Sequence, residues 1–71
     1  MKTSYMLCIN NRDYAASLEM RKIYRVLPDA DATRHNQVRV IDESGEDYLY
    51  PRERFVPIAV PSAAKKVLQT V

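Results

Sequence analysis

The sequence predicts a mainly β domain, a small five-stranded antiparallel barrel followed by a short C-terminal helix. Short runs of β-branched and aromatic residues recur between turn-forming residues, as is typical of such sheets. In residues 61–71, apolar side chains recur at helical spacing. A chain of 71 residues holds one small hydrophobic core. We therefore assign residues 1–60 to the barrel and residues 61–71 to a helix of the same domain.

The first predicted strand covers residues 5–9, an apolar run that ends at the turn formers Asn10 and Asn11. We expect Leu7 and Ile9 to point into the core. The following residues 10–21 have mixed character, and their periodicity does not separate a long loop from a short helical turn. We favour the loop.

Residues 22–27 predict a second strand, because they are rich in β-branched and aromatic types and stop before Pro28. Alternation places Tyr24 and Val26 on one face and Ile23, Arg25 and Leu27 on the other. After this strand we expect one helical turn over residues 30–33. Asp29 is its predicted N-cap, and Asn36 is predicted to adopt a left-handed conformation after it.

Residues 37–51 predict a β-hairpin with a three-residue loop, in which Gly45 supplies the left-handed position. The expected register pairs Asp42 with Glu46. It places Val40 opposite Tyr48, Val38 opposite Tyr50 and Arg39 opposite Leu49. Its predicted core face consists of Val38, Val40, Tyr48 and Tyr50. A two-residue loop at Ser44 and Gly45 ranks second, because it sets Glu43 against Glu46 and Asp42 against Asp47.

The chain after Pro51 predicts one tight turn over residues 52–54 and a last strand over residues 55–58. Pro57 favours an edge position for this strand, and the edge near Phe55 offers a contact for dimerisation. Pro61 then opens the C-terminal helix.

The C-terminal helix is amphipathic, with Lys65 and Lys66 pointing away from its apolar side chains. We expect these apolar side chains to cover the outer face of the sheet. The apolar helix residues are Ala64, Val67, Leu68 and Val71. The outer face consists of Ile23, Arg25, Leu27, Arg39, Ile41 and Leu49. In the alternative arrangement the helix is mobile, and this face binds a partner protein with Arg25 and Arg39 as polar anchors.

The order strand, long loop, strand, loop, hairpin, strand, one-turn link, strand resembles the layout of SH3-like β-barrels. The segment Leu49, Tyr50 and Pro51, followed by Phe55 and Val56, resembles the end of that fold. The chain also resembles a family of short uncharacterised bacterial proteins through CINN at 8–11, VLPD at 26–29, RVIDESGEDYLYP at 39–51 and FVPI at 55–58. This resemblance implies a fold and brings no activity with it. The chain lacks the tryptophan of the proline-rich-peptide binders, so none of their ligand residues is assigned.

The residue inventory favours a protein that is not an enzyme. Cys8 lies in an apolar strand, and the single histidine, His35, lies in a different loop. Nothing around the paired carboxylates Glu43 and Glu46 indicates burial that would shift their pKa. Asp29, Asp31, His35 and the hairpin acids lack metal-ligand spacing. We therefore expect no catalytic residue, no metal, no cofactor and no small-molecule ligand.

The sequence favours a binding role in the cytoplasm. No apolar run has the length of a membrane span, and the single cysteine fits a reducing compartment. A partner protein is the first hypothesis, and nucleic acid is the second because several arginines are interleaved with tyrosines. The net charge of +2 permits anion binding without requiring it. The candidate binding residues are Tyr14, Arg39, Arg52 and Arg54, of which Tyr14, Arg52 and Arg54 are expected to be neighbours.

Overall fold

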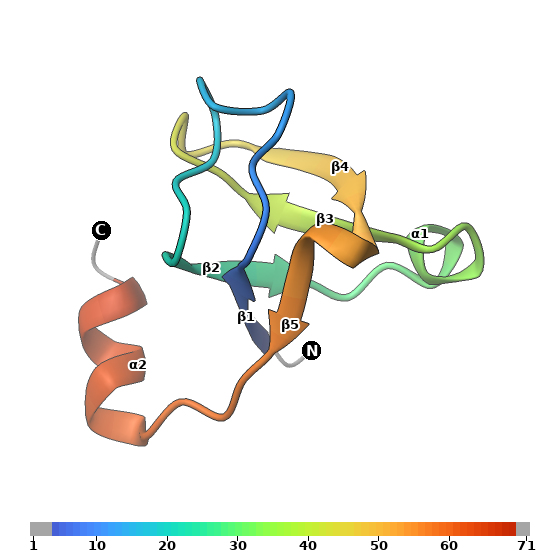
Figure 1. Ribbon diagram of the computed structural model, residues 1–71. Helices are drawn as coiled ribbons and strands as arrows, with labels where there is room; N and C mark the ends of the chain where they lie inside the picture. The colour runs from blue at the N-terminus through green and yellow to red at the C-terminus, as the bar shows by residue number, and fades with distance from the viewer. Residues whose placement is uncertain (1–3, 70–71) are drawn as a thin grey trace.

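In the computed structural model, five antiparallel strands form one strongly curled sheet, a half-barrel of the small SH3-like type (Figure 1). The strand order is β4-β3-β2-β1-β5. The structure describes residues 4–69, with the side chains of residues 4–67. The strands are β1 Ser4–Cys8, β2 Ile23–Leu27, β3 Gln37–Ile41, β4 Asp47–Pro51 and β5 Phe55–Pro57. The helical elements are α1 Ala30–Arg34, the 3-10 turn η1 Arg52–Arg54 and α2 Ser62–Gln69.

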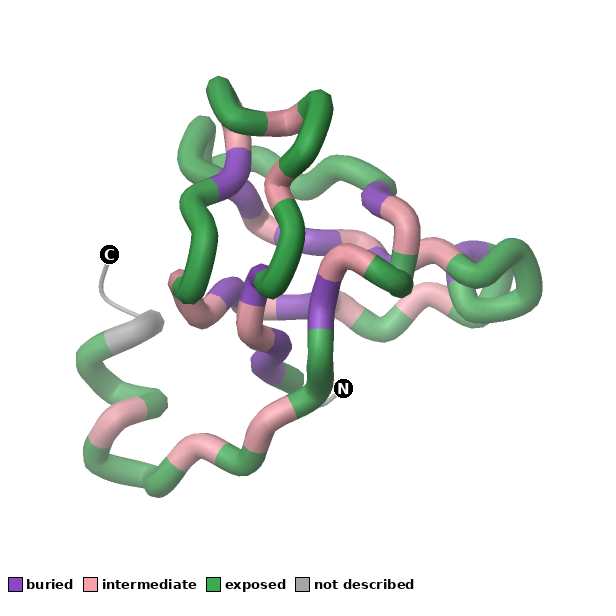
Figure 2. The backbone as a smooth tube through the Cα atoms, in the orientation of Figure 1, coloured by how far each residue is buried: buried purple, intermediate pink, exposed green. Residues whose placement is uncertain are grey.

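The core fills the concave face of the curled sheet, where buried positions alternate with less buried ones along β2 and β3 (Figure 2). Leu18, from the long loop, closes this core and is almost fully buried. Figure 2 shows that exposed residues concentrate in the loops and in α2. The core cluster consists of Met6, Cys8, Leu18, Tyr24, Val26, Val38, Val40, Tyr50 and Phe55.

The predicted inward face of the first strand is wrong. The register pairs Met6 with Tyr24 and Cys8 with Phe55, so Met6 and Cys8 point into the core. Leu7 is half-buried on the outer face, and Ile9 is 45% exposed. Residues 5–9 are apolar on both faces, so their composition does not show which face is inward. The pairing with β2 and β5 decides it.

The predicted hairpin register is confirmed, with Val40 opposite Tyr48, Val38 opposite Tyr50 and Arg39 opposite Leu49, and with the Asp42 backbone N–H donating to the Glu46 carbonyl. Gly45 has φ +82°, the left-handed value that the three-residue loop requires. One member of the predicted core face is wrong, because Tyr48 is 50% exposed. Tyr48 lies near the hairpin end of the edge strand, outside the concave core, and its hydroxyl lies 3.4 Å from Glu46.

Several other local predictions are confirmed, although the last strand ends at Pro57 rather than at residue 58. Residues 10–21 form a loop of turns, and the faces of β2 alternate as expected. Asp29 caps α1 by accepting a hydrogen bond from the Ala32 backbone at 3.0 Å. Asn36 has a φ of +54°. β5 is an edge strand that contains Pro57, and η1 occupies the predicted tight turn.

Two tyrosine–carboxylate contacts tie the long loop to the hairpin turn. The Tyr50 hydroxyl lies 2.5 Å from Asp42 and 2.9 Å from the Ser17 hydroxyl. The Tyr24 hydroxyl donates to Glu43 at 2.5 Å and accepts from the Glu19 backbone at 2.7 Å. Because these groups come from distant parts of the chain, they fix the loop against the barrel.

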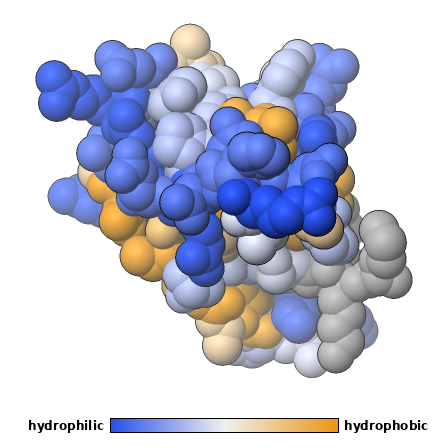
Figure 3. Space-filling model, turned by 90° about the vertical axis from the view of Figure 1, so that its right-hand side faces the viewer, coloured by the Kyte–Doolittle hydropathy of each residue, from blue (hydrophilic) through white to orange (hydrophobic). Residues whose placement is uncertain are grey.

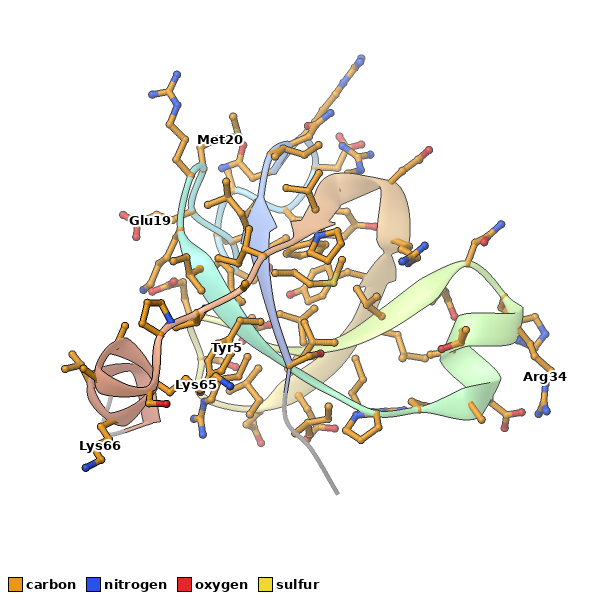
Figure 4. The ribbon with its side chains drawn as sticks, turned by 90° about the horizontal axis from the view of Figure 1, so that it is seen from below. Tyr5, Glu19, Met20, Arg34, Lys65 and Lys66 are labelled. Carbon is orange, nitrogen blue, oxygen red and sulfur yellow. The ribbon has the colours of Figure 1, made fainter. Side chains whose placement is uncertain are left out.

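The expected covering of the outer sheet face by the C-terminal helix is not what the structure shows. Val67 is 66% exposed, and Ala64 is only half-buried. The predicted contacts of Leu68 and Val71 lie outside the described side chains. Tyr5 also points outward from β1, yet it is only 3% exposed, and in the view of Figure 4 it lies on the side of β1 toward Lys65 of α2. The exposure of Val67 shows that α2 does not cover the outer face as expected.

Candidate binding surface

Neighbouring strands place a row of apolar side chains on the outer face. The register sets Val56 of β5 beside Leu7 of β1, and Leu7 beside Ile23 of β2. Ile9 lies two residues beyond Leu7 and therefore faces the same way. We call Leu7, Ile9, Ile23 and Val56 the outer patch.

Two members of the outer patch are open to solvent. Ile9 is 45% exposed and Val56 is 37% exposed, whereas Leu7 and Ile23 are half-buried. Figure 3 shows that hydrophobic side chains also gather in a band from the left to the bottom of the molecule, below mostly hydrophilic ones. The face seen in this view is therefore divided into polar and apolar regions.

Arg54 lies at the rim of the outer patch. Its backbone carbonyl accepts a hydrogen bond from Ile9 at 2.9 Å. Its guanidinium donates to the Asn10 side chain at 3.0 Å and lies 5.7 Å from the centre of the Tyr14 ring. The Tyr14 ring in turn meets Tyr50 edge to face at 5.1 Å. The structure thus brings together two of the predicted binding residues, Tyr14 and Arg54.

Arg52 is exposed in η1, and among the described residues no hydrogen bond or cation–ring contact joins its side chain to Tyr14 or Arg54. Its backbone N–H donates to the Asn36 carbonyl at 2.9 Å, while its side chain makes no ion pair within residues 4–67. It borders a surface hollow formed by the end of β4, η1 and β5. The hollow is lined by Asn36, Pro51, Arg52, Glu53, Phe55 and Pro57.

Arg39 lies apart from the other three candidates and joins two acidic residues. Its guanidinium donates to Asp29 at 2.8 Å and to Asp47 at 2.9 Å. The hydrogen bond to Asp29, followed by that to Asp47, raises the pKa of Arg39. The pKa of Asp29 is lowered first by the Ala32 backbone N–H and then by Arg39. Arg39 therefore holds the start of α1 against β3 and β4.

The pKa values of Cys8 and Glu43 are shifted by their surroundings in the fold. Burial raises the pKa of the Cys8 thiol, which keeps it protonated. The Glu43 carboxylate is held ionised, because its hydrogen bonds to Lys22 and then to Tyr24 lower its pKa. Within the described residues, no three histidine, cysteine or acidic side chains form a group that could hold a metal ion.

A second hollow lies between β2 and the hairpin turn. Its volume is about 250 Å³, and its charged lining residues are Lys22, Arg25, Asp42 and Glu43. The Lys22 ammonium lies 2.6 Å from the Glu43 carboxylate, so charge is compensated inside the hollow. This arrangement supports the packing of the turn and favours no particular ligand.

The sequence predicts only Ile23 of the outer patch on the outer face. Leu7 and Ile9 are predicted in the core, and Val56 is assigned to no face. Strand alternation was the available signal, but it identifies the face only when the pairing partners of β1 are known.

Comparisons with protein-family models, with curated proteins and with solved structures found no match to this chain. Neither helix within residues 4–69 is both long and apolar enough to cross a membrane.

Proposed function

We propose that this protein is a non-enzymatic interaction module of the cytoplasm that binds a partner protein through the outer patch. The observation that carries the proposal is the exposure of Ile9 and Val56 on one face, beside the half-buried Leu7. Contiguous exposed apolar side chains with a polar rim are typical of protein-binding surfaces.

The neighbouring Arg54 supplies a polar rim of fixed geometry. The Asn10 side chain and the Tyr14 ring hold its guanidinium, so little side-chain freedom remains to be lost on binding. Arginine and aromatic residues are enriched where interface energy is concentrated. A partner segment with apolar side chains next to a carboxylate would complement this surface.

Nucleic acid has less support as a partner. Tyr24 and Tyr50 are buried in the core, and Arg54 lies over the ring of Tyr14. Tyr48 is exposed but follows directly after Glu46 and Asp47, whose charges oppose phosphate. The arginines thus lack the free aromatic faces on which single strands stack.

The proposal is tested by affinity capture from a lysate of the source cells with the double variant Ile9→Ser/Val56→Ser. We expect a protein retained by the wild type to be lost with this variant, while melting curves show that the variant folds. Leu49→Ser is the matched control, since Leu49 is 42% exposed at the opposite end of the sheet. Equal retention of every captured protein by the wild type and by the double variant would contradict the proposal.

A parallel titration with oligonucleotides tests the alternative. We expect no amide shifts in the labelled protein with single- or double-stranded DNA or RNA at near-physiological salt. Shifts clustered at Tyr14, Arg52 and Arg54 that weaken steeply with salt would instead indicate phosphate contacts.

A further inference from the structure

β4 is an edge strand, and no hydrogen-bond partner within residues 4–69 is recorded for its outward backbone groups. Its only strand neighbour within residues 4–69 is β3, and Figure 1 shows open space beyond it. The Asp42 backbone N–H donates to the Glu46 carbonyl at 3.1 Å. Hydrogen-bonded pairs alternate along an antiparallel ladder, so Val40–Tyr48 and Val38–Tyr50 are the next hydrogen-bonded pairs between β3 and β4. The N–H and C=O groups of Asp47 and Leu49 therefore point away from β3.

The other edge of the sheet cannot accept a strand in the same way. The Ile9 N–H donates to the Arg54 carbonyl, and the Ile58 N–H donates to the Tyr5 carbonyl. In this ladder the backbone groups of Val56 face β1, so those of Phe55 and Pro57 point outward. The Phe55 N–H already donates to the Arg52 carbonyl, and Pro57 has no N–H. The dimer contact that the sequence suggested near Phe55 therefore lacks donors.

Large apolar side chains are exposed on both faces of β4. Tyr48 is 50% exposed on one side of the sheet, and Leu49 is 42% exposed on the other. A strand added at this edge would cover both side chains while pairing the free backbone groups. Such unprotected edges are sites of strand addition.

We propose that β4 pairs antiparallel with β4 of a second copy of this chain, with Leu49 opposite Leu49 at the twofold axis. Asp47 of each copy then lies opposite Pro51 of the other, and Tyr48 lies opposite Tyr50. The two Leu49 residues exchange both backbone hydrogen bonds, and each Asp47 N–H donates to a Pro51 carbonyl. Because Pro51 has no N–H, the Asp47 carbonyl lacks its partner at each end of the paired strands.

Charge complementarity favours a second copy and selects this register. With Leu49 at the axis, Glu46 of each copy faces Arg52 of the other. Both side chains are exposed, and neither forms an ion pair within residues 4–67. Moving the axis to Tyr48 places Glu46 opposite Tyr50, and moving it to Tyr50 places Asp47 opposite Glu53. Of the three registers, only the one with Leu49 at the axis pairs Glu46 with Arg52 at both ends and sets no like charges opposite each other.

The expected dimer is weak. One strand edge buries less than the roughly 1,200 Å² of a stable interface, so we expect weak association, with a dissociation constant on the order of 1 mM. This contact is separate from the outer patch, and either proposal can fail without the other.

The test is sedimentation of the full chain at concentrations around this dissociation constant, with dilution followed by amide spectra. We expect a monomer–dimer equilibrium and dilution shifts at the Asp47 and Leu49 amides. Arg52→Glu or Glu46→Arg should weaken association about tenfold, because two attractive pairs become repulsive. The double variant Glu46→Arg/Arg52→Glu should restore it.

Arg12→Glu is the matched control, since it makes the same charge change at an exposed loop position and should leave association unchanged. Sedimentation as a monomer throughout would overturn the proposal. A dimer that Arg52→Glu leaves intact, or that the double variant fails to restore, would overturn it equally.

Discussion

The Tyr50 hydroxyl joins the long loop to the hairpin through Ser17 and the buried Asp42. Tyr50→Phe keeps the ring but leaves Asp42 with one donor fewer, so we expect a loss of about 1 to 3 kcal/mol in unfolding free energy. Tyr48→Phe is the control, because the Tyr48 ring is half exposed and its change should stay within about 0.5 kcal/mol. Urea unfolding measures both, and equal midpoints for the two variants would contradict a structural role for the Tyr50 hydroxyl.

Asp42 links stability to pH. Burial acts to raise its pKa, but hydrogen bonds from Ser44 and Tyr50 outweigh burial and lower the pKa below its usual value. A lowered pKa in the folded state gives stability that is complete above the unfolded value of about 3.9 and is lost as the pH falls further. Urea unfolding from pH 6 down to acid should therefore show a smaller acid loss for Asp42→Asn than for the wild type.

The control for this pH profile is Ala16→Ser in the exposed part of the loop, which removes no titratable group and should keep the wild-type acid loss. An Asp42→Asn profile parallel to that of the wild type would show that this carboxylate is not preferentially ionised in the fold.

The hairpin is the element that the sequence specified best, because turn chemistry and charge pairing favoured the same register. Gly45 contributes through its backbone alone, since a Cβ added there meets no atom within 4 Å while φ is +82°. Gly45→Ala should therefore cost about 1 kcal/mol through conformational strain, and Gly45→Asn should cost less. Thermal melts measure the difference, and a neutral Gly45→Ala would contradict the turn assignment.

The inward face of β1 and the packing surface of α2 could not be predicted from local sequence patterns. β1 carries apolar side chains on both faces, so its inward face depends on pairing with β2 and β5, which lie far away in the sequence. The spacing in residues 61–71 correctly predicted a helix, but amphipathic spacing does not identify the surface on which a helix packs. The ion pair between Arg39 and Asp29 could not be predicted either, because it depends on where α1 and its N-cap Asp29 lie relative to β3.

Across the whole molecule, the order of loops and strands was enough to predict a curled five-stranded sheet. The approach of Tyr14 to Arg54 also follows from this topology, since the long loop and η1 lie at the same end of the barrel. The outer patch required the register of three strands and was accessible only from the structure. Its exposure is the basis of the proposed binding role.

Photocrosslinking is the most direct test of that role. A photoreactive amino acid is placed at Val56 in the outer patch and, as a control, at the exposed Arg34 on α1. In source cells, we predict that the Val56 position crosslinks to a defined partner protein and that the Arg34 position does not. Crosslinks of equal pattern from both positions, or crosslinks to nucleic acid from Val56, would contradict binding of a partner protein through the outer patch.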